Sequence, residues 1–521
     1  MHSKRAMSRR AFVGTSAGTG LLLGLGELPG LRNLPMVSSA EASQVKKTVT
    51  FTSDIEPTVR FLEDTPRDRI LEELLVRVKK DLSYRETVAA LFLAGIRNIP
   101  GSALAHHRNV GGALHAVLVV HSAHLASLNS VDRERWLPIL WAVDNFKHEQ
   151  SQPKRVNASR RPTWQMPPLD ESTIPTGTKA RAAFVEAMEN WDEGAADVAA
   201  AGLARSSGSS EVFDLLCRYG SRDYRYIGHK AIFVANAWRT LQSVGWRHAE
   251  PVLRSLARAL TAYWHSKGHP ARSELRADRC WRRNTESIAG VRVGWQSGNI
   301  DESASTEFLA TLRQGSDVEA SDQAVELLNQ RVSPHSLWDS IKCAACEMIM
   351  RKPNFGTLHA STTMNALHYT FQTSGNDETR RLILLQAAGF ATLFREDSNQ
   401  RLTHSERIDG IEPIDVEPDP ADALDEIFMS LETDRLKAAR KALSYLQNDG
   451  DPTPLIQRAQ QLINRKGDNA HDYKFASAVR EDFWSMSSPW RERQLAATLL
   501  LARGPREADT AVFQRIQTAL G

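Results

Sequence analysis

Residues 66–82 read P-R-D-R-I-L-E-E-L-L-V-R-V-K-K-D-L, and this pattern recurs along most of the chain. The apolar residues fall at i, i+3, i+4 and i+7, which is the spacing of one face of an amphipathic α-helix. Pro66 stands where a first helical turn tolerates proline. The same period predicts helices over 83–97, 110–128, 131–147, 178–204, 209–219, 228–243, 247–265, 319–330, 335–350, 357–372, 377–395, 421–447, 453–465, 470–484, 489–503 and 507–519.

Strand-like alternation is confined to Thr48–Thr52 and Val291–Trp295. We therefore expect an all-α fold of antiparallel helix pairs in a solenoid-like or toroidal multi-helix bundle. Long polar loops are predicted at 149–177, which carries five prolines, at 266–304, and at the acidic stretch 397–420. The first of these is expected to cross the surface. We expect residues 43–521 to form a single large helical body. If it is subdivided, the divisions would fall near 149–177 and 397–420.

The N-terminus has the order of a secretion signal. Lys4, Arg5, Arg9 and Arg10 form a basic region, and a weakly apolar stretch over 13–31 follows. Ala40-Glu41-Ala42 places small residues at positions −3 and −1 of a cleavage site. The adjacent arginines before Ala11-Phe12 are typical of the twin-arginine type. We expect residues 1–42 to be a signal peptide read by the twin-arginine translocase, and the protein to be periplasmic or extracellular.

The apolar stretch of the signal is too short and too interrupted, by glycines and Pro29, to be a permanent membrane anchor. The whole chain and residues 1–42 each carry a net charge of +3, so the remaining 479 residues are close to neutral. Because nucleic acids and anionic membranes need a basic face, neither is an expected partner.

Four cysteines are present: Cys217, Cys280, Cys343 and Cys346. The last two form C-A-A-C in a helical stretch with no second cysteine or histidine pair at the spacing of a metal knuckle. The favoured interpretation is two buried thiols on one helical turn, and the alternative is a redox pair.

Three stretches of the chain resemble one another. They are H-H-R-N-V-G-G-A-L-H-A-V-L-V-V from His106, G-H-K-A-I-F-V-A-N-A-W-R-T-L from Gly228, and L-H-A-S-T-T-M-N-A-L-H-Y-T-F from Leu358, with a shorter echo, A-H-D-Y-K-F-A-S-A-V, from Ala470. Each places a histidine near a helix start. Gly245 and Gly375 lie sixteen residues after His229 and His359, where a turn to a second helix is expected.

Recurrent helix pairs suggest that the leading histidines occupy equivalent positions. We predict that His107, or its neighbour His106, faces one internal cavity together with His229, His359 and His471. The set would bind a metal ion, hold an anionic substrate or move protons as general acids and bases. Tyr226 and Lys474 lie three residues from a site histidine and are further catalytic candidates. Asp223 is a candidate carboxylate ligand or partner of a ligand. The alternative is that each histidine makes only a local hydrogen bond.

The same four islands resemble the questin oxidase-like family, on H-H-R-N-V-G-G-A-L-H, Y-I-G-H-K-A-I, L-H-A-S-T-T-M-N-A-L and A-H-D-Y-K-F, within about residues 100–485. The resemblance implies an oxidoreductase that acts on a hydrophobic aromatic substrate by Baeyer–Villiger-type monooxygenation, with NADPH as cofactor. The chain departs from the family pattern at Phe233 and Asn236, where a further histidine is expected, and at Ser361-Thr362-Thr363. Its export signal is also unlike a cytosolic enzyme that draws on NADPH.

Familiar cofactor motifs are missing from the sequence. No G-x-G-x-x-G follows a strand, and no Walker loop or H-E-x-x-H is present. G-T-S-A-G at 14–18 lies inside the signal peptide and is a chance match to a nucleophile elbow. Any site must therefore be assembled from scattered helical residues. The competing hypothesis is a non-enzymatic helical-repeat protein that binds partners or serves as a periplasmic scaffold, which would spread its histidines along a groove or surface.

Overall fold

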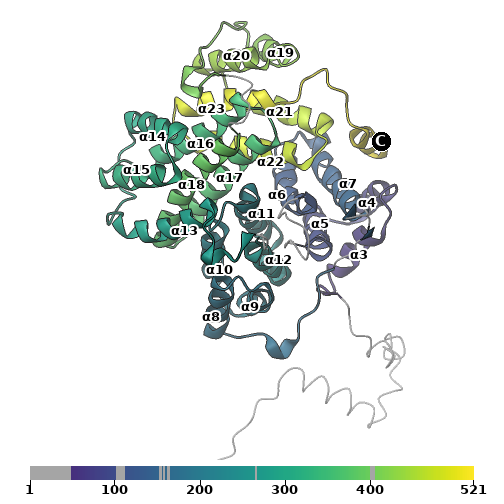
Figure 1. Ribbon diagram of the computed structural model, residues 1–521. Helices are drawn as coiled ribbons and strands as arrows, with labels where there is room; N and C mark the ends of the chain where they lie inside the picture. The colour runs from purple at the N-terminus through teal and green to yellow at the C-terminus, as the bar shows by residue number, and fades with distance from the viewer. Residues whose placement is uncertain are drawn as a thin grey trace, which may run out of the picture. The chain divides into compact units, whose positions relative to one another are not determined.

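The computed structural model describes residues 48–100, 112–151, 155–156, 159–160, 165–263, 267–398 and 405–520. These residues form 22 α-helices, and the prediction of an all-α fold is confirmed (Figure 1). The only paired strands in this part of the chain are two residues long each, Arg155–Val156 (β1) and Ser159–Arg160 (β2), joined as an antiparallel hairpin. The predicted signal peptide over 1–42 lies outside the described residues.

The helices have the following bounds: α3 Glu56–Asp64, α4 Ile70–Lys80, α5 Tyr84–Asn98, α6 His115–Leu128, α7 Leu137–Ser151, α8 Thr178–Glu189, α9 Glu193–Ser206, α10 Ser209–Gly220, α11 His229–Val244, α12 Ala249–Thr261, α13 Arg276–Ser287, α14 Glu302–Gln314, α15 Asp317–Asn329, α16 Pro334–Arg351, α17 Phe355–Thr373, α18 Asp377–Ser398, α19 Pro420–Ser430, α20 Arg435–Gln447, α21 Pro452–Lys466, α22 Ala470–Trp484, α23 Trp490–Thr498 and α24 Ala511–Leu520.

Two of the predicted helices are each two helices in the structure. The stretch 178–204 breaks before α9, where the Asp192 side chain accepts a hydrogen bond from the backbone of Ala195. The stretch 421–447 breaks before α20, where Asp434 accepts from the backbone of Lys437. In both cases an aspartate that fits the helical period acts as an N-cap, because its short side chain satisfies a free N–H of the new helix.

Both predicted strands are wrong. Val291–Trp295 is a turn, since Gly294 has φ +69° and the buried Trp295 indole donates to Asp377. Thr48–Thr52 joins no sheet in the described residues; Val49 donates from its backbone to the carbonyl of Met166. The predicted loop 266–304 also contains α13, and α14 begins at its end. Thr48–Thr52 is held by backbone contact with Met166 and Val291–Trp295 by the buried Trp295 indole, and a period of two reveals neither.

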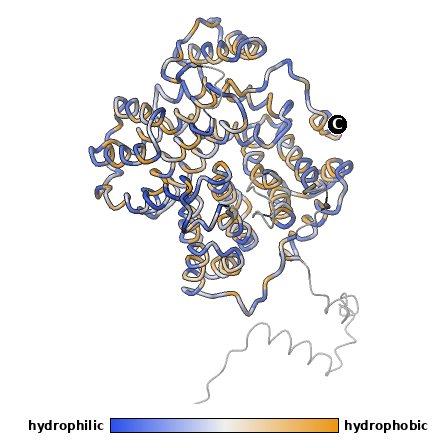
Figure 2. Tube along the Cα trace, in the orientation of Figure 1, coloured by the Kyte–Doolittle hydropathy of each residue, from blue (hydrophilic) through white to orange (hydrophobic). Residues whose placement is uncertain are grey.

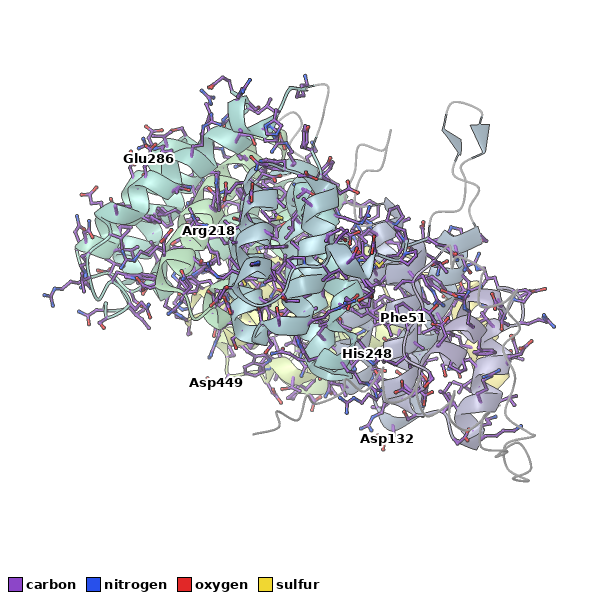
Figure 3. The ribbon with its side chains drawn as sticks, turned by 90° about the horizontal axis from the view of Figure 1, so that it is seen from below. Phe51, Asp132, Arg218, His248, Glu286 and Asp449 are labelled. Atoms are coloured by element: carbon purple, nitrogen blue, oxygen red, sulfur yellow. The ribbon has the colours of Figure 1, made fainter. Side chains whose placement is uncertain are left out.

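The predicted loops at 149–177 and 397–420 are partly packed into the body. Met166 is fully buried, and its backbone N–H donates to the carbonyl of Arg97. Ile408 is buried as well, and its N–H donates to the carboxylate of Glu347. Residues Thr48–Gly521 form one compact unit. In Figure 2 the hydrophobic positions face inward between helices, and in Figure 3 Asp132, Glu286 and Asp449 lie at the periphery.

Four helices form a closed ring at the centre of this unit. Helix α6 packs on α11, α11 on α17, α17 on α22, and α22 back on α6 (Figure 1). Three polar contacts between them join positions that lie at similar distances from the two helix starts: Asn236 to the carbonyl of Leu118, Arg239 to Glu481, and Asn365 to Asp482. The four helices therefore run in the same direction, with their N-termini together. The solenoid-like or toroidal arrangement of helix pairs remains a prediction.

Cys343 and Cys346 lie on α16, and both thiols are free and buried. Burial raises the pKa of each thiol well above its ordinary value. Because the thiolate is the reactive form, this geometry agrees with the structural interpretation of C-A-A-C rather than the redox one.

None of the helices in the described part of the chain combines the length and apolar character needed to cross a membrane.

Candidate metal centre

Four histidines meet where the helix ring begins. His115 is the first residue of α6, His229 the first of α11, His471 the second of α22, and His359 the fifth of α17. The ring centroids of His229 and His359 are 4.6 Å apart, those of His115 and His229 4.8 Å, and those of His359 and His471 4.9 Å. We call these four residues the histidine cluster. Side chains in a first turn point toward the helix start, so the convergence of four N-termini brings the imidazoles together.

Each imidazole of the cluster is anchored through the same nitrogen. His229 Nδ1 lies 2.5 Å from the carbonyl oxygen of Tyr226, and His115 Nδ1 lies 2.8 Å from that of Gly112. His359 Nδ1 contacts the carbonyl oxygen of Phe355. A carbonyl oxygen only accepts, so Nδ1 of these three rings carries the proton. A neutral imidazole protonated at Nδ1 has an unshared pair at Nε2.

The unshared pairs face one another. His229 Nε2 is 3.0 Å from His115 Nε2 and 3.1 Å from His359 Nε2. Two nitrogens bound at about 2.1 Å to one ion lie about 3.4 Å apart in tetrahedral geometry and about 3.0 Å apart at right angles. Neutral rings at this spacing would repel, whereas a cation between them would bind all three lone pairs.

His471 completes the cluster from the fourth helix. Its Nδ1 lies 3.1 Å from the side-chain oxygen of Asn469, which again leaves Nε2 for a ligand. Ligand nitrogens of His115, His359 and His471 lie within 4.8 Å of one another, in a group that contains only imidazoles in the described residues. Opposite ligands across one ion are about 4.2 Å apart. The widest of these spacings must therefore close slightly, or be bridged by a water molecule.

A strained turn places His229. Tyr226 has φ +60° and Ile227 has φ +48°, in the left-handed region that a β-branched residue rarely adopts. Gly228 follows with φ +77°, and a Cβ there would overlap the side chain of Thr363 on α17. Such strain concentrates at functional sites because the surrounding structure must hold it. Here it aims the carbonyl of Tyr226 at His229 and brings α11 against α17.

Capping residues set two of the other three helix starts. Asn354 and Asn469 each form a capping box at the start of α17 and α22. The Asn469 side chain accepts from the backbone N–H of His471 at 2.8 Å and also holds the imidazole. The residue that starts the helix therefore also orients the ligand, which is the role of partners behind metal-binding histidines.

The electrostatic environment keeps the imidazoles neutral. Burial lowers the pKa of His115, His229 and His359 well below the ordinary value, and that of His471 to about 4. The positive ends of four helix dipoles point at the cluster, and they also lower the pKa values of the imidazoles. Of the roles predicted for the set, proton transfer near neutral pH is therefore not favoured for these four imidazoles.

Lys474 is the group whose pKa lies near neutrality. It sits one turn along α22 from His471, is 3 % exposed, and its Nζ has no hydrogen-bond partner in the described residues. Burial lowers its pKa to about 7. Its charge in turn lowers the pKa of all four histidines.

The structure brings together three of the four predicted histidines, His229, His359 and His471, with Lys474 beside them. His107 and His106 lie outside the described residues. The backbone carbonyl of Tyr226, rather than its phenol, touches His229. Asp223 is held by Lys230 at 2.7 Å and by the backbone of Arg225 at 3.0 Å, and Lys230 is itself fully buried. Both carboxylate oxygens of Asp223 are thus engaged by Lys230 and Arg225, and its role as a ligand or as a partner of a ligand stays a prediction.

Sequence reasoning missed His115. The repeat was aligned on the His106-His107 pair. The stretch H-A-V-L-V-V from His115 matches H-K-A-I-F-V from His229 more closely. Aligning the apolar runs, rather than the first histidine of each island, would have found it.

Comparisons with known proteins give no relative: no family model, no curated protein and no solved structure matches this chain.

Proposed function

We propose that this protein is a metal-dependent enzyme whose ion is held by the histidine cluster. The observation that carries the proposal is the anchoring of all four rings through Nδ1, which leaves Nε2 of each ring for a ligand role. Ligand nitrogens of His115, His359 and His471 lie within 4.8 Å of one another, and His229 Nε2 lies 3.0 Å and 3.1 Å from the Nε2 atoms of His115 and His359. Imidazole ligands suit zinc, copper, iron and nickel. A cation bound only by neutral imidazoles keeps its full charge and serves as a strong Lewis acid or, if redox-active, as an electron acceptor.

We propose an oxidoreductase acting on a small hydrophobic, aromatic substrate. The class comes from the resemblance of the four islands to questin oxidase-like enzymes, and each of the four islands contains one cluster histidine. The substrate type is supported by an apolar groove whose lining includes Phe355, which stacks on His471 with ring centroids 4.8 Å apart. Lys474 would hold or release the proton that the reaction exchanges. NADPH rests on the resemblance alone.

The scaffold hypothesis receives less support. A scaffold would spread its histidines over a binding surface, whereas here two rings are buried and four meet. The unpaired buried amine of Lys474 and the strained turn at Tyr226–Gly228 both lower the stability of the fold. A purely structural bundle would gain nothing from either.

Elemental analysis of the full chain tests the metal. We expect about one transition-metal ion per chain after purification without chelators, or after chelation and reconstitution with Zn²⁺, Cu²⁺, Fe²⁺ or Ni²⁺ in turn. The bound ion should raise the melting temperature of the protein. Less than about a tenth of an equivalent with each of these ions would refute a metal centre.

We also propose that the protein is exported through the twin-arginine translocase. Changing Arg9 and Arg10 together to lysine should leave the precursor in the cytoplasm with its helical content intact. Cell fractionation measures this. Normal export of the double variant would show that another route is used.

A further inference from the structure

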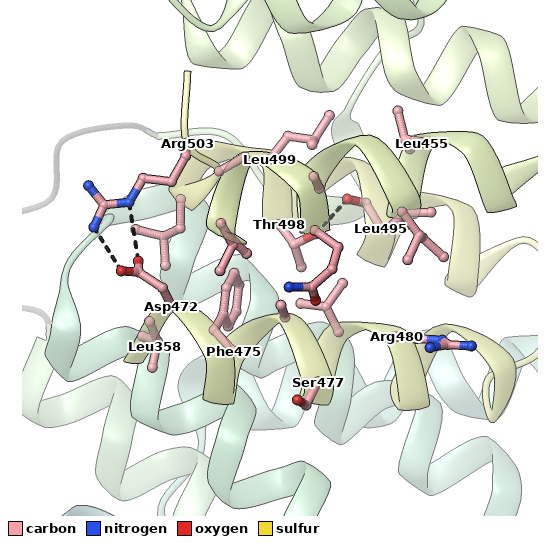
Figure 4. A pocket seen from close by; sticks show the side chains of 18 of the residues that line it. Leu358, Leu455, Asp472, Phe475, Ser477, Arg480, Leu495, Thr498, Leu499 and Arg503 are labelled. Atoms are coloured by element: carbon pink, nitrogen blue, oxygen red, sulfur yellow. Dashed lines mark hydrogen bonds and ion pairs between the residues drawn. The ribbon is translucent and has the colours of Figure 1, made fainter. Parts of the chain in front are cut away.

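An apolar groove of about 560 Å³ runs along the outer face of α22. Its walls come from α21, from α23 and the turn after it, and from the first turn of α17, and Figure 4 shows it from close by. We call it the α22 groove. It extends from Asp472 to Trp484, which is about 18 Å along a helix. The volume suits a single small molecule of cofactor or lipid size.

The walls of the groove are apolar and open. Phe475, Val479, Leu455 and Leu495 lie along it. Phe355 and Trp484, at its two ends, are each 58 % exposed. Large aromatic side chains left exposed beside a concave apolar surface mark a binding site rather than ordinary surface.

Of two arginines in the groove, one has ion-pair partners among the described residues and the other has none. At one end Arg503 is paired with Asp472, Asp468 and Glu507. Toward the other end stands Arg480, whose guanidinium has no ion pair or hydrogen bond in the described part of the chain (Figure 4). Partial burial lowers its pKa, so its charge is poorly solvated. The carboxylate of Glu481 lies near enough to act on Arg480 but makes its ion pair with Arg239. A half-buried arginine that has no ion pair of its own, in a largely apolar groove, is complementary to an anion.

We propose that the α22 groove binds an amphiphilic monoanion, with its acidic group on Arg480 and its apolar body lying toward Phe355. Arg480 is nine residues from His471, about 14 Å along the helix. A long-chain or polycyclic carboxylic acid of that length would bring its apolar end to the aromatic ring that stacks on His471. That the apolar end is the reacting end rests on the proposed function. The binding of the acid in the groove does not depend on it.

Fluorescence titration with cis-parinaric acid tests the groove, with its methyl ester as the uncharged comparison. The full chain should bind the acid saturably and at least about 10-fold more tightly than the ester. Arg480→Gln should lower the affinity for the acid by about 10-fold and leave the affinity for the ester unchanged. Arg458→Gln is the matched control, since Arg458 is an exposed arginine on α21 that pairs with Asp425 outside the lining.

Ala476→Phe, which fills the groove from α22, should weaken acid and ester alike. Circular dichroism and metal content of each variant show whether it is folded. Equal affinity for acid and ester in the unchanged protein, or unchanged binding in Arg480→Gln, would overturn the proposal. Dissociation of a dimer by the probe would overturn it too, by assigning the groove to a second copy. Loss of metal in a histidine variant that still binds parinaric acid would separate the two sites and leave the groove standing.

Discussion

His229→Ala is expected to lower the affinity for the metal ion by more than about 100-fold and to abolish activity. His229 Nε2 lies between the Nε2 atoms of His115 and His359, so its removal takes away the central ligand. The helices should persist, because the lost hydrogen bond to Tyr226 contributes only about 1 kcal/mol. Isothermal titration calorimetry with Zn²⁺ on the chelated protein, together with circular dichroism, measures both effects.

His269→Ala is the control, because His269 is exposed, hydrogen-bonds only to backbone atoms, and packs its ring against Tyr263 rather than against the histidine cluster. His115→Ala and His359→Ala should behave like His229→Ala. His107→Ala extends the series to the histidine outside the described residues. If it binds metal as tightly as the unchanged protein, the predicted ligand at that end is His115 instead. Unchanged metal affinity in His229→Ala would refute the centre itself.

Lys474→Met is expected to stabilise the metal-free protein by up to about 5 kcal/mol at pH 7. The buried amine has no partner, and its pKa falls from the ordinary 10.5 to about 7. Between these values the unfolded chain binds a proton that the folded chain does not, so the stability of the unchanged protein rises with pH over this window. The gain from Lys474→Met is therefore full at pH 7 and below and disappears near pH 10.5.

Urea unfolding of the chelated protein at several pH values from 6 to 9 measures this slope. Lys79→Met, at an exposed position on α4, should change neither the stability nor its pH dependence. A Lys474→Met protein that is less stable than the unchanged one would show that the amine has a stabilising partner. If the variant is more stable but inactive with its metal bound, Lys474 serves the reaction at the expense of the fold.

The sequence by itself determined the helical class and much of the site. The 3.6-residue period is a local property, so it predicted most helices, and it failed where Asp192 and Asp434 start new helices inside a periodic run. Histidines at the heads of three islands were visible as a repeat. Their anchoring is local as well, because each Nδ1 bonds to an oxygen two to four residues earlier in its own chain segment.

Only the tertiary structure decided how these pieces meet. That α6 closes the ring between α11 and α22, so that His115 joins the histidine cluster, depends on packing between segments more than a hundred residues apart. The same packing buries Lys474 and so gives it a pKa near 7. It also forms the groove in which Arg480 has no ion pair within the described residues. Local periodicity says which face of a helix is buried, but not which helix buries it, because many partners offer an equally apolar face.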